Sequence, residues 1–291
     1  MRITKRSLVL ALSGLTATSV ITGVGMTTQQ VLAQPDSEAP TIDELYVPPP
    51  APANVPLTPA ALDFVQRTTG KLYVRFKDGE SKEGTATVVA SESRDMLLTE
   101  GRLLLNERNE RPTEVRFVPG ERLIENIPAS IYGWWTARNW ATMPGFQYNS
   151  PHWAQNNIAV VLLNTRNEQH IEKAVNGAQG ICFNCPLKGH VHVYAYHKGY
   201  DGGFNMDTTC QVIADFSVAT QPYGTCIEGN PAFATGPSGG PIIANVDPKT
   251  GLGMVAAINT WVAHFPDGRR SNGGAVIGAG GAALYNGYRA Q

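Results

Sequence analysis

A serine set among glycines in residues 234–243, which read ATGPSGGPII, is the strongest candidate for chemistry in the sequence. Glycine accepts positive φ angles and lets a substrate approach the backbone closely, so this stretch is typical of a tight, exposed loop that leads into a buried strand. In such a loop the backbone amides of Gly236 and Ser238 can point at one position, which is the geometry of an oxyanion hole. Ser238 would then be the nucleophile. The alternative is a glycine-rich hairpin in which Ser238 has no chemical role.

Four cysteines, Cys182, Cys185, Cys210 and Cys226, form a second set of candidate residues. An even number of cysteines in an exported chain indicates disulfides, and four cysteines allow three pairings. We favour Cys210 with Cys226, because that bond would close a short loop just before the serine stretch. Cys182 and Cys185 would then pair with each other or stay reduced.

The same region also permits a metal site, because His190 and His192 follow Cys182 and Cys185 closely. Alternate residues of a strand face the same side, so the two imidazoles could join two thiolates around zinc. The spacing is shorter than in common zinc modules, and export favours oxidised sulfur. We therefore predict no metal in this protein.

The N-terminal part of the chain predicts export. Residues 1–33 place three basic residues before an apolar run and small residues before the expected cleavage point, as in a secretory signal peptide. Residues 34–60 are rich in proline, which predicts an extended linker, and residues 61–291 form the folded part. No second apolar stretch is long enough for a membrane span. We expect a protein secreted to the extracellular space or the periplasm.

Charge and composition narrow the possible partners. The full chain has a formal net charge of -1 at pH 7 and becomes more acidic once the basic leader is removed. Such a balance does not favour a nucleic acid or an anionic membrane as partner. A glycine-rich run at 276–283 resembles a dinucleotide-binding loop, but the strand and acidic residue that this fold needs afterwards are missing, so no cofactor is predicted.

Short segments with alternating apolar and β-branched residues, separated by Gly and Asp, predict antiparallel strands throughout the folded part. We expect strands at 71–76, 84–90, 96–99, 114–118, 127–135, 157–163, 189–196, 209–214, 242–246 and 252–258. Only 61–67 and 281–289 are typical of short helices. Many short strands without crossover helices indicate an all-β barrel or sandwich rather than an α/β fold.

The serine stretch resembles the nucleophile loop of chymotrypsin-like serine proteases, and two further segments match the family in the same order. Residues 97–103, LLTEGRL, match the segment that carries the family's His, with Arg102 at the His position. Residues 157–160, NIAV, match the segment that opens with the family's Asp, with Asn157 at that position. The resemblance, to secreted bacterial members, covers about residues 61–290.

This resemblance implies a fold and a pocket. The fold would consist of two six-stranded antiparallel β-barrels of chymotrypsin type, at about 61–165 and 175–280, with a short C-terminal helix. The specificity pocket would have Ala232 at its base and Asn259, Thr260 and Trp261 along its wall. An uncharged base would accept an apolar or small side chain rather than Lys or Arg.

Two of the three catalytic positions depart from the family. Serine is a poor nucleophile until a base takes its proton, and Arg102 has no acceptor and does not deprotonate in proteins. Asn157 could still orient a His, but no His precedes His152 in the chain. We therefore expect a degenerate triad in a secreted protease homologue that does not cleave peptides and whose cleft binds a peptide or protein.

Two alternatives stay open from the sequence. The first is an active secreted endopeptidase in which a non-standard base such as His152 serves Ser238. The second is a structural β protein whose cleft has no function. If the serine loop is intact, the double change Arg102→His with Asn157→Asp should produce measurable esterase activity. The sequence does not predict an oligomeric state.

Overall fold

The computed structural model describes residues 29–31, 55–124, 127–151, 153–185, 189–196, 205–212, 223–228, 238–264 and 270–291. Its elements in chain order are β1 (Gln29–Val31), α2 (Pro59–Thr68), β2 (Thr69–Arg75), β3 (Ser81–Val88), β4 (Met96–Thr99), α3 (Gly101–Leu104), β5 (Glu114–Pro119), β6 (Arg122–Ile124), β7 (Ile127–Ala129), β8 (Trp135–Thr142), β9 (Ala159–Leu163), α4 (Ile171–Ala174), β10 (Gly180–Phe183), β11 (Gly189–Tyr196), β12 (Asn205–Val212), β13 (Tyr223–Glu228), β14 (Pro241–Ala244), β15 (Met254–His264), β16 (Arg270–Val276) and α5 (Ala279–Tyr288).

Six strands of the first half close into a barrel in the order β2, β3, β4, β9, β8 and β5. Neighbouring strands are antiparallel, and β2 alternates between buried and less buried residues because one of its faces lines the barrel. All five residues of β9 are buried, since this strand packs between β4 and β8 and contacts α5 on its other face. The barrel interior is filled by apolar side chains that include Leu72, Phe76, Val88, Leu97, Phe117 and Val161.

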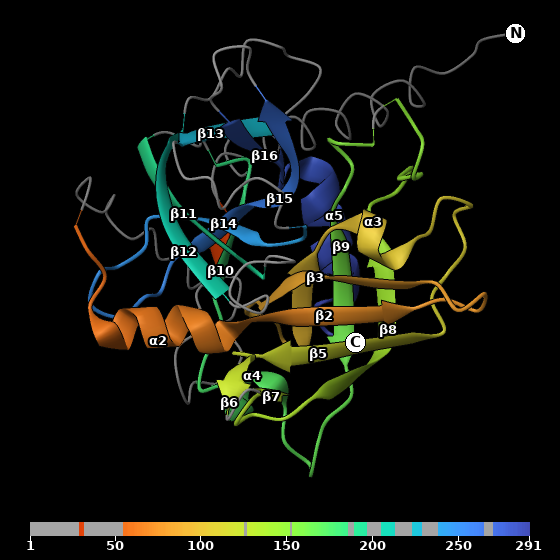
Figure 1. Ribbon diagram of the computed structural model, residues 1–291, viewed down its shortest axis with the longest axis horizontal. Helices are drawn as coiled ribbons and strands as arrows, with labels where there is room; N and C mark the ends of the chain where they lie inside the picture. The colour runs from red at the N-terminus through yellow and green to blue at the C-terminus, as the bar shows by residue number, and fades with distance from the viewer. Residues whose placement is uncertain are drawn as a thin grey trace, which may run out of the picture.

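The later strands, together with β1 from the N-terminal part of the chain, join in one sheet of the order β1, β10, β15, β14, β11, β12, β13 and β16, and β15 also pairs with β16. Figure 1 shows strands β11 to β16, coloured green-teal to blue, beside the orange to green strands of the first barrel. The closed six-stranded barrel and the C-terminal helix confirm those parts of the expected fold. The second barrel stays a prediction. β1 lies inside the expected signal peptide, and the division into leader, linker and folded part also stays a prediction.

Two helices, α2 and α5, pack against the strands. α2 begins where the Thr58 side chain accepts a hydrogen bond from the Ala61 amide, with Pro59 in the first turn, where its missing N–H costs nothing. α5 lies against β9 and β10, and the Tyr285 hydroxyl donates to the Ala90 carbonyl oxygen at 2.8 Å. Both helices were expected from the sequence, and both begin two residues earlier than expected.

One expected strand is wrong. The apolar run 127–135 was expected to form a single strand, but β7 ends at Ala129 and β8 begins only at Trp135. A turn separates them, in which Gly133 adopts a φ of 69° and the Gly133 amide donates to the Ser130 carbonyl at 3.0 Å. Glycine suits this turn because a positive φ costs it little.

In the described part of the chain, no helix is both long and apolar enough to cross a membrane.

Cys182 and Cys185 form a disulfide, which confirms one of the two states expected for this pair. Their sulfurs are therefore not available as the thiolates of a zinc site. The disulfide is consistent with an extracellular location. The side chains of Cys210 and Cys226 lie outside the described part of the structure, so their pairing stays a prediction, as does the signal peptide.

Candidate active site

The serine loop is held from both halves of the chain. The Thr85 amide of β3 donates to the Ser238 carbonyl oxygen at 2.8 Å, which fixes the loop against the first barrel. On the other side, the Gly239 amide donates to the carbonyl oxygen of Asn259 at 2.9 Å, and the Asn259 amide donates to the carbonyl oxygen of Gly240 at 2.8 Å. Ser238 is half-buried between these anchors. The loop therefore presents the hydroxyl from a fixed backbone.

Gly239 cannot be replaced without strain. Its φ is 81°, and a Cβ atom at this position would penetrate the Thr85 carbonyl oxygen and the Thr99 hydroxyl. We expect Gly239→Ala to lower the free energy of unfolding by about 2–4 kcal/mol, measured by urea denaturation. Gly145→Ala is the matched control, because Gly145 has a φ of 79° and open space around its Cβ position. Equal losses in the two variants would contradict the close packing of the serine loop.

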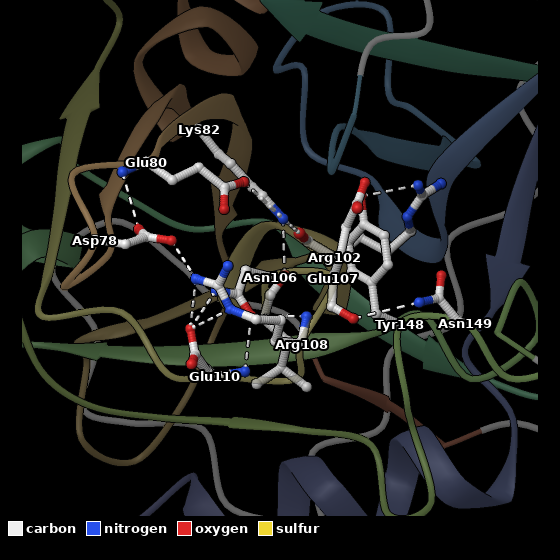
Figure 2. A network of polar contacts seen from close by, with 11 residues as sticks. Asp78, Glu80, Lys82, Arg102, Asn106, Glu107, Arg108, Glu110, Tyr148 and Asn149 are labelled. Carbon is white, nitrogen blue, oxygen red and sulfur yellow. Dashed lines mark hydrogen bonds and ion pairs between the residues drawn. The ribbon is translucent and has the colours of Figure 1, made fainter.

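The Arg102 side chain is not arranged to act as a base for Ser238. It lies on α3, and its guanidinium stacks over the Tyr148 ring at 4.5 Å and the Trp153 ring at 4.6 Å. One guanidinium nitrogen donates to the Tyr148 hydroxyl at 3.0 Å, as Figure 2 shows. Arginine has five donors and no acceptor, so this side chain cannot receive a proton from Ser238. The arrangement fits a positioned cation rather than a catalytic base.

Asn157 links the two segments that were expected to carry the triad. Its side-chain oxygen accepts from the Arg102 backbone amide at 2.8 Å, and its side-chain nitrogen donates to the Glu100 carboxylate at 2.9 Å. Asn157 is fully buried just before β9. The structure thus brings the expected His and Asp positions together, and it adds a residue that the sequence analysis did not select.

That residue is Glu100, whose side chain is only 3% exposed. Its carboxylate accepts a hydrogen bond from the Ser238 side chain in addition to the one from Asn157. Burial raises the pKa of Glu100 to about 7, while Arg102, Ser238, Asn157 and Lys82 pull the pKa back toward its ordinary value. A basic group therefore does touch the Ser238 hydroxyl, although it is a carboxylate and not an imidazole.

Lys82 of β3 fixes the short helix that carries this site. Its ammonium group donates to the Arg102 and Leu105 carbonyl oxygens at 3.0 and 2.8 Å, which satisfies acceptors at the C-terminal end of α3. The same group lies 4.5 Å from the centre of the Tyr148 ring. Burial lowers the pKa of Lys82, and its positive charge also acts on Glu100. The helix is thereby tied to the first barrel.

Several expected site residues lie outside the described residues. They are Gly236 of the oxyanion hole, Ala232 of the pocket base, His152, and the side chains of His190 and Trp261. Asn259 pairs through its backbone with Gly239 and Gly240, and both Asn259 and Thr260 are buried, while the pocket itself stays a prediction. The roles of Ser238, Arg102 and Asn157 also stay predictions.

A cavity of about 350 Å³ opens elsewhere, on the outer side of β2, β3 and β5, next to the exposed Trp134. It is lined by Tyr73, Arg75, Lys82, Glu83, Glu114 and Arg116, among others. Lys82 is shared between this cavity and the site, because its ammonium group also bonds to α3.

A signal for Glu100 was present in the sequence. Residues 96–105 read MLLTEGRLLL, in which an acidic side chain interrupts an apolar run that must be buried. A carboxylate in such a run needs hydrogen-bond partners, because an unpaired buried charge is very costly. The family pattern places its His two residues later, so a motif match alone does not select the carboxylate.

Comparison with solved structures bears on the fold. The chain matches the thermostable serine protease AL20 from an extremophilic microorganism with a TM-score of 0.62 and 19% identity, over 78% of this chain and 98% of that one. It matches the protease Anisep from Arthrobacter nicotinovorans with a TM-score of 0.63 and 18% identity, over 82% and 99% of the two chains. HL collagenase matches with a TM-score of 0.52 and 12% identity, over 78% and 94%.

Searches against protein-family models and against curated proteins returned no match. The fold assignment therefore depends on three-dimensional similarity, together with the closed six-stranded barrel and the C-terminal helix. With structural matches that extend over at least 94% of each of these proteases, this chain has the fold of the chymotrypsin-like serine proteases.

Proposed function

We propose that this chain is a secreted protein of the chymotrypsin-like serine protease fold that has lost His-dependent peptide cleavage and keeps its cleft to bind a peptide or protein segment. The observation that carries the proposal is the position of Arg102. Its guanidinium is stacked on Tyr148 and Trp153, and a permanently protonated group cannot accept the Ser238 proton. Removal of the base from a serine protease triad costs on the order of 10⁶ in turnover.

Peptide cleavage tests the first half of the proposal. We expect the purified wild-type chain to digest a mixed peptide library no faster than Ser238→Ala, as measured by mass spectrometry over hours. Cleavage that Ser238→Ala abolishes would overturn the loss of peptidase activity. Parallel loss in His152→Ala would then identify the alternative enzyme, in which His152 serves as the base.

Peptide binding tests the second half. We expect an immobilised peptide array to retain the wild-type chain, with preference for apolar or small side chains, because the expected pocket base is Ala232. Ala232→Trp should fill that pocket and weaken binding at least tenfold. Binding that Ala232→Trp leaves unchanged, or no binding at all, would instead favour the structural β protein.

A further inference from the structure

Glu100 supplies what the degenerate triad lacks, a proton acceptor in contact with Ser238. The carboxylate lies at the N-terminal end of α3, accepts the Ser238 side-chain hydrogen bond, and is held on its other side by the Asn157 amide at 2.9 Å. Both partners are fixed, since Asn157 is fully buried and the Ser238 carbonyl oxygen is bound to the Thr85 amide. A hydroxyl with its proton already shared toward a carboxylate is a nucleophile with an adjacent base.

We propose that Glu100 is the general base for Ser238 and that this pair takes acyl groups from carboxylic esters whose leaving group departs without a proton, such as phenyl esters. In this step the Ser238 oxygen forms a bond to the carbonyl carbon and its proton passes to Glu100. The ester C–O bond then breaks, and the phenolate leaves with the bonding electron pair. The inference rests on the proposed role of Ser238 as the nucleophile and adds a substrate class to the same site.

The burial of Glu100 explains why such esters and not peptides are the substrates. An amide nitrogen must be protonated as it leaves, and in the His mechanism the imidazole carries the proton from serine to the leaving group. Glu100 is 3% exposed and bonded to Asn157, so it cannot swing into the solvent-facing site to do this. It is equally unable to activate an incoming water. The acyl group should therefore stay on Ser238, and one leaving group should be released per chain.

The basicity of Glu100 suits this step near neutral pH. A general base works best when its pKa lies close to the working pH, and burial raises the pKa of Glu100 to about 7. The charged groups that face it are Arg102 on its own helix and Lys82 of β3, and both favour the ionised carboxylate. Among the described residues of the serine loop and of the segment before β9, it meets the neutral Ser238 and Asn157. Acylation should therefore rise with pH through about 7 and then level off.

The test uses 4-nitrophenyl acetate with the purified mature chain. We expect a burst of one 4-nitrophenolate per chain followed by slow turnover, and an acetyl group on Ser238 in the mass spectrum. Glu100→Gln should slow the burst at least 100-fold, because the amide keeps the size and an acceptor for Asn157 but takes up no proton. Glu172→Gln is the matched control: Glu172 is also buried with a pKa raised to about 7, yet it lies on α4 and is not part of this site. Its burst should be unchanged.

The outcomes separate this inference from the proposed function. A Ser238-dependent burst that Glu100→Gln leaves intact, or a burst rate of the wild-type chain that does not change between pH 5.5 and 8.5, overturns the role of Glu100 while the loss of peptide cleavage still stands. Absence of any burst also overturns it. The pH profile needs no substitution, so the inference stays falsifiable even if Glu100→Gln fails to fold. Ser238-dependent peptide cleavage would overturn the proposed function, and Glu100→Gln would then show independently whether Glu100 is the base.

Discussion

The triple variant Glu100→Ala, Arg102→His and Asn157→Asp should hydrolyse 4-nitrophenyl acetate with turnover on the order of 10³-fold faster than the wild-type chain, since a restored base recovers part of what a triad loses without one. The Asn157 side chain already contacts the backbone amide of residue 102, so a carboxylate introduced there can orient an introduced imidazole. An imidazole can also carry protons to the leaving group and from water, which the buried Glu100 cannot do.

The double variant Arg102→His with Asn157→Asp should be much weaker than the triple. The Asn157 amide nitrogen lies 2.9 Å from the Glu100 carboxylate, so the change to Asp sets two acceptors against each other in a buried site. The esterase activity expected from sequence for the double variant stays a prediction, and that prediction did not take Glu100 into account. The triple variant with Ser238→Ala added is the control. A folded triple variant with no more turnover than this control would show that the residues are not placed as a triad.

Lowering the pH from 7 to 4.5 should stabilise the protein by about 5 kcal/mol through Glu100 and Glu172 together, in roughly equal parts. Burial raises the pKa of both from 4.5 to about 7 in the folded chain. Between these values the folded chain holds protons that the unfolded chain has released. Stability is therefore fully present below pH 4.5 and is lost as pH rises through 7. Glu172 has a second reason for this, because its buried Oε2 atom has no hydrogen-bond partner among the described residues.

Urea denaturation at pH 4.5, 5.5, 6.5 and 7.5 measures this effect as a fall in the free energy of unfolding. The variant with both Glu100→Gln and Glu172→Gln should lose most of the slope. A smaller slope of the same sign should remain, because burial also raises the pKa of Glu121. Stability that rises with pH across this range, or a slope that both substitutions leave intact, would show that these carboxylates are not buried as described.

Strands that are continuous runs of apolar and β-branched residues could be predicted from the sequence. Strands in which this pattern is interrupted were missed. β4 and β11 were placed with their observed bounds, because each is a short run of apolar and β-branched residues with clear ends. β8 was missed, because most of its residues are only half-buried and Arg138 and Asn139 interrupt its apolar pattern. β10 was also missed; its sequence, GICF, begins with glycine, a residue that is depleted in strands.

In the candidate site, the motif segments could be predicted from sequence, but contacts between residues far apart in the chain could not. The serine loop and the segments of Arg102 and Asn157 could be selected from sequence motifs, and the structure brings those segments together. The direction of the Arg102 side chain could not be predicted, because it depends on Tyr148 and Trp153, which lie far from it in the sequence, between β8 and β9. The contact of Glu100 with Ser238 likewise joins two halves of the chain.

The hydrogen bond from the Thr85 amide to the Ser238 carbonyl oxygen limits which halves of related chains can be combined. Neither half of the chain holds the serine in place alone, since Thr85 comes from the N-terminal barrel and the loop belongs to the C-terminal strands. In a chimera that takes one half from a homologue, Ser238 would therefore keep its position only if the backbone of β3 still places the Thr85 amide against the Ser238 carbonyl oxygen. The position of Ser238 therefore depends on contacts from both halves of the chain.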